Sequence, residues 1–188
     1  MRIDLRRVIF ALAITMFLFV PSTTSALPAI DRSETQGVVG GLHLSANGSG
    51  QISAVAANLP RVIEVYTATW CENCVDAEHA LEDALHGENV TFLVNHRYIG
   101  ETEDPLGAQS SDDRWERLYG TMSKESVSMT RAPPTMVFDG SRLKAGTSSE
   151  GESLESDYRD LFDMGAPLGG ITSSSLSWDG NLNSGTVS

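Results

Sequence analysis

The chain has 188 residues, of which 40% are hydrophobic, enough for one domain with a core but too few for two ordinary domains with flanking segments. Its 25 acidic and 13 basic side chains give a formal net charge of −12. Nucleic-acid binding needs clustered Lys and Arg, so this balance argues against a nucleic-acid partner. We interpret the acidic side chains as a solvated surface that promotes solubility.

The first 26 residues have the three zones of an export signal. Three arginines come first, an uncharged run over 8–20 follows, and small residues precede a cleavage site after Ala26. The run is short for a membrane-spanning helix, which needs about 20 residues. We therefore expect residues 1–26 to be a cleaved signal peptide and the mature chain to be secreted or extracytoplasmic. An uncleaved segment would instead anchor the protein to a membrane.

Composition divides the rest of the chain into three parts. Residues 27–58 are rich in Gly, Ser, Ala and Asn, and predict a linker with one edge strand in the apolar patch 38–44. Residues 59–166 carry the periodic apolar segments and are expected to form the domain. Residues 167–188 are a Ser-, Gly- and Asn-rich tail, either disordered or the start of another β module.

A strand followed directly by a helix is the clearest local pattern. The segment 62–67 reads Val-Ile-Glu-Val-Tyr-Thr, which is typical of a strand because it is β-branched and aromatic. The segment 72–86 lacks Gly and Pro, spaces apolar residues four apart and is followed by Gly87, which predicts a helix. This order places Cys71 at the N-terminus of the helix.

The rest of the domain alternates between strand and helix patterns. In chain order we predict a strand over 90–99, a helix over 112–119 with Asp113 and Glu116 as a capping pair, a strand over 135–138, a hairpin turn at Asp139-Gly140, a strand over 142–145, and a helix that opens with Ser149-x-x-Glu152 and ends before Gly165. This order predicts an α/β domain whose mixed central sheet is flanked by helices.

Cys71 and Cys74 are the two cysteines of the chain, and outside the cytoplasm they can persist as a disulfide. They are a reactive pair, half of a metal site or an inert local bridge. A helix N-terminus lowers the pKa of a thiol from about 8.5, and this favours Cys71 as the nucleophile. Cys74 lies one helical turn further on and would be the resolving thiol.

A metal site is not expected from the histidines. A closed zinc site normally needs four protein ligands, and none of the four histidines has the paired spacing that would complete a set with the two cysteines. We interpret His79 and His86 as solvated helix residues and His96 as a strand-end histidine in solvent. The sequence predicts no cofactor either.

The stretch 62–74, with Trp70-Cys71-Glu72-Asn73-Cys74 at its end, resembles the active site of the thioredoxin superfamily. The resemblance covers roughly residues 60 to 165 and implies a thioredoxin-like fold. It also implies that Pro134 is a cis-proline beside the disulfide, and that Trp70 shields the disulfide and helps to bind substrate. A looser similarity to an uncharacterised exported thioredoxin-like family depends on Glu64, His96, Asp104-Pro105 and the run 137–140.

Two features depart from typical thioredoxins. Val65 stands where that family has a buried aspartate, and strand alternation turns Glu64 to the opposite face, where we interpret it as a surface or edge carboxylate. Glu72 and Asn73 replace the usual Gly-Pro between the cysteines, so the direction of electron flow stays open.

The leading hypothesis is a thiol-disulfide oxidoreductase that acts outside the cytoplasm through Cys71 and Cys74. Its partners would be exported proteins with cysteines and a redox partner of unknown identity. One alternative is a copper-binding thioredoxin-like chaperone in which both cysteines and His96 hold Cu(I), because soft thiolates and an imidazole suit that ion. The other is a structural domain with a permanent disulfide.

Overall fold

A computed structural model describes residues 28–33, 50–98, 104–178 and 185–187. The predicted signal peptide and the predicted edge strand over 38–44 lie outside these ranges. Within them, no helix is both long and apolar enough to cross a membrane.

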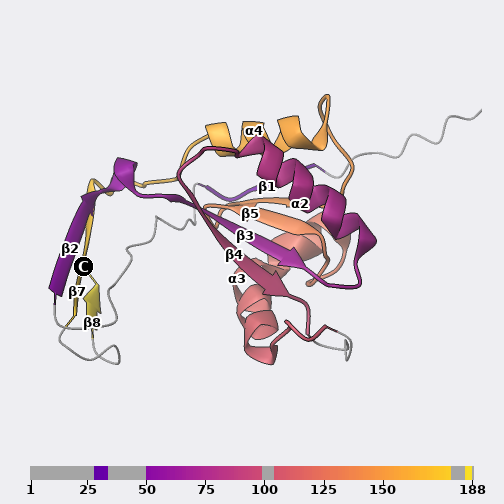
Figure 1. The fold of residues 1–188 in the computed structure, drawn as a ribbon, viewed down its shortest axis with the longest axis horizontal. Helices are drawn as coiled ribbons and strands as arrows, with labels where there is room; N and C mark the ends of the chain where they lie inside the picture. The colour runs from indigo at the N-terminus through magenta and orange to yellow at the C-terminus, as the bar shows by residue number, and fades with distance from the viewer. Residues whose placement is uncertain (1–27, 34–49, 99–103, 179–184, 188) are drawn as a thin grey trace, which may run out of the picture.

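The centre of the molecule is a five-stranded sheet in the order β1-β6-β5-β3-β4 (Figure 1). Its strands are β1 (Ile30–Asp31), β3 (Arg61–Thr67), β4 (Val90–His96), β5 (Thr135–Phe138) and β6 (Arg142–Ala145). β3 and β4 run parallel, whereas the other neighbours pair antiparallel. The sheet is therefore mixed, as the sequence predicts.

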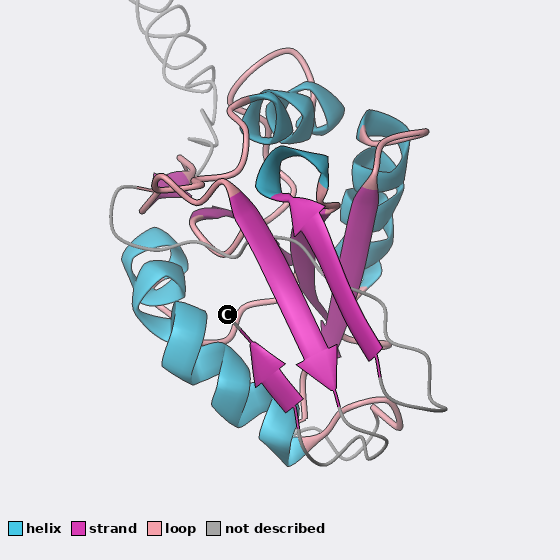
Figure 2. Ribbon diagram, turned by 90° about the vertical axis from the view of Figure 1, so that its left-hand side faces the viewer, coloured by secondary structure: helices cyan, strands magenta, loops and turns pink. Residues whose placement is uncertain are grey.

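Three helices cover this sheet, namely α2 (Glu72–Ala84), α3 (Gln109–Val127) and α4 (Leu154–Asp163). Figure 1 shows α2 and α4 together on one face and α3 on the opposite face, and Figure 2 shows the same layers after a quarter turn. This arrangement confirms the predicted α/β class with helices flanking a mixed sheet.

Each face of the sheet has its own core because strand residues alternate between the faces. Ile63 and Val65 of β3 belong to a cluster with apolar residues of α2 and α4. Tyr66, on the other face, stacks on Trp115 of α3 with ring centroids 4.5 Å apart. β3 is thus buried on both sides and packed up to the strand end at which the Cys71 loop begins.

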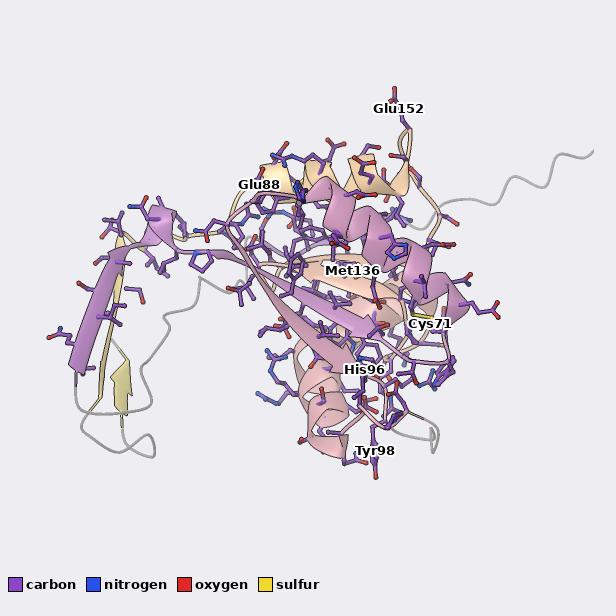
Figure 3. All side chains as sticks on the ribbon, in the orientation of Figure 1. Cys71, Glu88, His96, Tyr98, Met136 and Glu152 are labelled. Atoms are coloured by element: carbon purple, nitrogen blue, oxygen red, sulfur yellow. A yellow bond between two sulfur atoms is a disulfide. The ribbon has the colours of Figure 1, made fainter. Side chains whose placement is uncertain are left out.

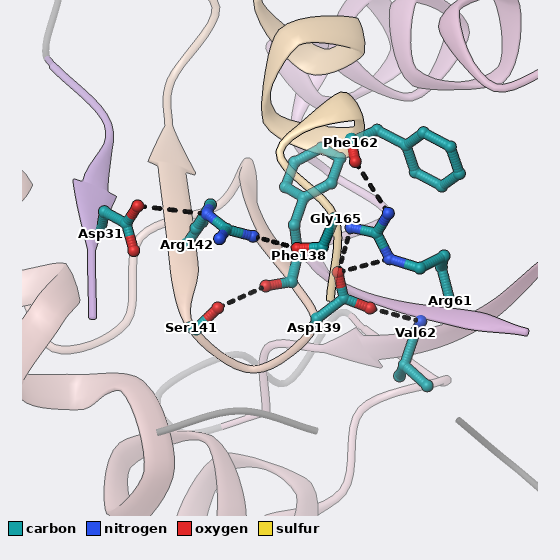
Figure 4. A network of polar contacts seen from close by, with 9 residues as sticks. All are labelled: Asp31, Arg61, Val62, Phe138, Asp139, Ser141, Arg142, Phe162 and Gly165. Carbon is teal, nitrogen blue, oxygen red and sulfur yellow. Dashed lines mark hydrogen bonds and ion pairs between the residues drawn. The ribbon is translucent and has the colours of Figure 1, made fainter. Parts of the chain in front are cut away.

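The turn between β5 and β6 lies at Asp139-Gly140, as predicted, and is fastened to β3 (Figure 4). Both residues have positive φ, 46° and 66°, a backbone region that Asp and Gly tolerate best. The Asp139 carboxylate accepts hydrogen bonds from Val62 N at 3.1 Å and from Arg61 Nε at 2.7 Å. Arg61 also donates to the carbonyl of Phe162 at 2.8 Å, which ties α4 to the same point.

A second, three-stranded sheet lies apart from the first, at the left of Figure 1. It consists of β2 (Gly50–Val55), β7 (Ser173–Trp178) and β8 (Gly185–Val187) in the order β2-β7-β8, all antiparallel. A short 3₁₀ turn, η1 (Ala56–Asn58), connects β2 to β3. The Ser- and Gly-rich segments on either side of the domain therefore contribute strands that pair with each other.

Helix α3 is longer than predicted. It begins after Ala108, which makes no side-chain cap, so the predicted capping pair of Asp113 and Glu116 is wrong. The prediction stopped before Gly120, but the helix continues through it, and Gly120, Met122 and Ser123 extend its buried face.

Two other boundaries also differ. The start predicted for α4 at Ser149 is wrong, because Ser153 caps the helix instead: its hydroxyl accepts from Ser156 N while Ser156 Oγ accepts from Ser153 N. A serine here takes the role that the pattern assigns to glutamate. Gly165 follows the helix with a φ of 78°, as predicted. β4 ends at His96, before the predicted residue 99.

Candidate functional site

The two cysteines lie at the junction between the end of β3 and the start of α2. Cys71 is the N-cap of α2 with extended backbone angles, φ −92° and ψ 98°. Its N–H donates to Ala68 O at 3.0 Å, and Cys74 N donates to Cys71 O at 3.1 Å, which forms the turn that starts the helix. A disulfide joins Cys71 and Cys74, whose Cα atoms are 5.3 Å apart, and Figure 3 shows its yellow bond.

The two cysteines differ in their access to solvent. Cys74 is 2% exposed and faces inward beside Ala77 on α2, whereas Cys71 is partly exposed. The helix N-terminus also favours negative charge on the Cys71 sulfur, because its backbone N–H groups point outward there. An incoming thiolate would therefore meet Cys71 first, and a Cys71 thiolate would be the better stabilised of the two.

Pro134 lies at the same end of the sheet. The Pro133–Pro134 bond is cis, as expected from the resemblance, and Pro134 is buried. It directly precedes β5, in which Thr135 pairs with Tyr66 of β3, so Pro134 is next to the strand end that leads to Cys71. Its carbonyl accepts a hydrogen bond from Gly146 N at 2.8 Å.

Trp70, immediately before the disulfide, leaves 42% of its surface exposed. The guanidinium of Arg97 lies 5.9 Å from the centre of its ring, within the range of a cation–π contact. Val75, the residue after Cys74, is 52% exposed. Exposed apolar side chains thus precede and follow the cysteine pair in the sequence.

Asp104 fixes the loop that carries these residues, a role that the sequence did not predict. Its carboxylate is buried and accepts hydrogen bonds from Thr69 N at 2.9 Å and from Leu106 N at 3.1 Å. Burial alone would raise the pKa of Asp104, but these two bonds and the contact with His96 outweigh burial and lower it. The Asp104-Pro105 pair was the sequence signal for this role, since an Asp side chain commonly accepts a hydrogen bond from the backbone N–H two residues later.

His96 is not the solvent-exposed histidine that the sequence suggested. Its side chain is 17% exposed and its Nδ1 lies 3.1 Å from Asp104 Oδ2. The reason is the parallel register of β3 and β4, which pairs His96 with Thr67 and places it beside the Asp104 loop. His79 and His86, by contrast, are exposed on and just after α2, as predicted.

Another hydrogen bond joins β3 to α2 behind the disulfide. Thr67 Oγ1 donates to Glu78 Oε1 at 2.5 Å, and Glu78 lies four residues after Cys74, so the two share one side of the helix. The position six residues before Cys71 is Val65, which is 3% exposed and packed in the apolar core.

The prediction that Glu64 is a surface or edge carboxylate is wrong, because its side chain is completely buried. α3 covers its face of the sheet, where Arg114 pairs with both carboxylate oxygens and Tyr119 donates a hydrogen bond at 2.5 Å. These contacts of Glu64 therefore join β3 to α3, on the face of the sheet opposite α2.

Within the described ranges, no group of three or more His, Cys, Asp and Glu side chains is arranged so that it could hold a metal ion. Cu(I) would require Cys71 and Cys74 to be reduced, whereas here they are bonded to each other.

The Cys71-x-x-Cys74 disulfide and the mixed sheet between helices are compatible with a thioredoxin-like fold. Comparisons of the chain with protein-family models, with curated proteins and with solved structures found no match.

Proposed function

We propose that the protein is a thiol-disulfide oxidoreductase that acts outside the cytoplasm on exported proteins with cysteines. The observation that carries this proposal is the asymmetry of the disulfide: Cys71 is partly exposed at a helix N-terminus and Cys74 is buried one turn further on. An inert bridge needs no such difference between its sulfurs, whereas exchange through a mixed disulfide does.

In the oxidising direction, a substrate thiolate attacks Sγ of Cys71. The bond between Cys71 and Cys74 breaks, and Cys74 leaves as a thiolate that takes up a proton. A second substrate thiolate then attacks the substrate sulfur of the mixed disulfide and releases Cys71 as a thiolate. The substrate loses two electrons and the cysteine pair gains them.

In the reducing direction, the Cys71 thiolate attacks a substrate disulfide and Cys74 then attacks Cys71 Sγ, which frees the reduced substrate and restores the disulfide. A separate redox partner returns the pair to its starting state in either direction. The helix N-terminus supports both steps, since Cys71 is the attacking group in one and the leaving group in the other.

Substrate binding is proposed for the surface beside the disulfide. Trp70 would pack against the substrate chain around its cysteine, since a half-exposed indole offers a large apolar area. Pro134 would line the other side of the disulfide. Asp104 would act as a positioning residue, because it holds Thr69 and hence the loop on which Trp70 and Cys71 lie.

The test is reduction of insulin disulfides by the mature chain with dithiothreitol as the electron source. The proposal predicts that catalytic amounts of protein accelerate insulin precipitation and that Cys71→Ser abolishes the effect. A matched control is Ser156→Ala in the N-terminal cap of α4, which should keep full activity. No acceleration by the unaltered chain, or acceleration that survives Cys71→Ser, would refute the proposal.

A further inference from the structure

β4 is an edge strand of the central sheet, since β3 is its single partner among the described strands. Its middle is exposed on both faces: Phe92 is 44%, Leu93 42% and Val94 57% exposed. Phe92 pairs with Ile63 on the α2 side, whereas Leu93 pairs with Glu64 on the α3 side. Neither helix layer covers the middle of this strand, and α3 reaches only its C-terminal end, where Ser111 Oγ donates to Asn95 Oδ1 at 2.8 Å.

The strand lacks the devices that normally protect a sheet edge. Proteins place charges, prolines, bulges or very short strands at such edges to prevent pairing with another chain. β4 has seven residues, and the run 90–95 contains no charged residue, no Pro and no Gly. An apolar, regular edge of this length is suited to receive another strand.

The sequence of β4 is complementary to itself in the antiparallel direction. With Leu93 placed opposite Leu93 of a second copy, Phe92 faces Val94 of that copy, and Thr91 faces Asn95. Within these five residues apolar pairs with apolar and polar with polar on both faces of the sheet, whereas Val90 faces His96 at each end of the contact. A parallel arrangement would not close into a two-fold dimer, whereas this one does.

Few charges meet in this arrangement. The run 90–95 carries no charge, Glu88 before the strand is already paired with Arg159 at 2.6 Å, and Arg97 after it lies over the Trp70 ring. In a chain with a formal net charge of −12, this uncharged edge is a surface on which two copies meet without strong repulsion.

We propose that the partner of this edge is a second copy of the chain, paired antiparallel through β4 with Leu93 on the two-fold axis. The two five-stranded sheets then form one continuous sheet. Cys71 follows β3, which runs parallel to β4, so the two disulfides lie toward opposite ends of the dimer and both stay open to substrate. The proposal stands independently of the redox function.

The experiment is sedimentation velocity on the mature chain over a concentration series, with hydrogen exchange of the β4 amides at high and low concentration. The unaltered chain should dimerise, and its β4 amides should be protected only where the dimer is populated. Leu93→Lys places two lysines opposite each other and should raise the dimer Kd by at least about tenfold. Phe92→Lys, at a position that is also exposed, should weaken the dimer as well.

Val55→Lys is the matched control. Val55 is 56% exposed and belongs to β2, an edge strand of the other sheet, so this variant should dimerise like the unaltered chain. Circular dichroism confirms that each variant is folded. A monomer at all concentrations would overturn the proposal, even with protected β4 amides, because another segment of the chain would then cover the edge. A dimer that survives both lysine variants in β4, or that Val55→Lys disrupts equally, would overturn it too.

Discussion

Asp104 is the residue whose replacement tests the geometry of the site most sharply. Asp104→Asn keeps the size of the side chain but removes the charge that attracts the N–H of Thr69, the N–H of Leu106 and His96. A hydrogen bond to a charged group contributes about 1.5–3 kcal/mol, and the amide retains part of each bond. We therefore expect a loss of about 2 kcal/mol in the free energy of unfolding at pH 7, which for a chain of this size lowers Tm by roughly 4–8 °C.

The pH dependence of this loss has a defined sign. The pKa of Asp104 in the folded protein lies below the ordinary value of 3.8, so its contribution is fully present above that value and declines as the pH falls through the lowered pKa. Urea unfolding of both proteins between pH 7 and pH 2 measures the difference in stability. The gap should shrink as the pH falls from about 5 into acid. A gap that stays constant down to pH 2, or no gap at pH 7, would refute this account of Asp104.

Three further outcomes are expected. Glu64→Gln should lower the free energy of unfolding by about 2 kcal/mol in urea denaturation, because Arg114 and Tyr119 lose a buried carboxylate; a change below about 0.5 kcal/mol would contradict the buried pairing. Trp70→Ala should leave Tm within about 2 °C, because the indole is half-exposed, but should raise KM in insulin reduction several-fold without an equal loss of kcat; an unchanged KM would remove Trp70 from substrate binding. Burial and the neighbouring Asp112 raise the pKa of Tyr66, and burial and Glu64 raise that of Tyr119, so neither phenol should ionise before the protein unfolds in base. Because folded-state pKa values are raised, stability should fall as the pH rises above about 10. In a Tyr98→Phe background, which removes the exposed phenol, absorbance at 295 nm that rises well before unfolding would argue against these contacts.

The elements around the cysteines were predictable because their signals are local. β3 and α2 follow from a β-branched run and from helix periodicity that ends at a glycine, and their junction places Cys71 at the helix N-terminus. The hairpin turn at Asp139-Gly140 has the same local character. The length of α3 was underestimated because a glycine after a helical pattern usually marks the end of the helix, whereas the buried face of α3 continues through Gly120 and Met122.

The contacts that complete the site join residues far apart in the chain. Asp104 meets Thr69 across 35 positions, and Glu64 meets Arg114 across 50. The pairing of β2 with β7 spans more than a hundred positions. Periodicity and composition describe neighbours along the chain, so they placed Cys71 at the helix N-terminus but did not predict the contact of Asp104 with its loop or the burial of Glu64.

The central claim is that Cys71, and not Cys74, is the sulfur that exchanges with substrate. It is tested most directly by treating the Cys74→Ser and Cys71→Ser variants with an activated disulfide on a peptide at pH 7 and locating the adduct by peptide mapping. The account predicts rapid formation of a mixed disulfide at Cys71 in the first variant and little or none at the buried Cys74 in the second. Equal rates in the two variants, or faster reaction at Cys74, would contradict it.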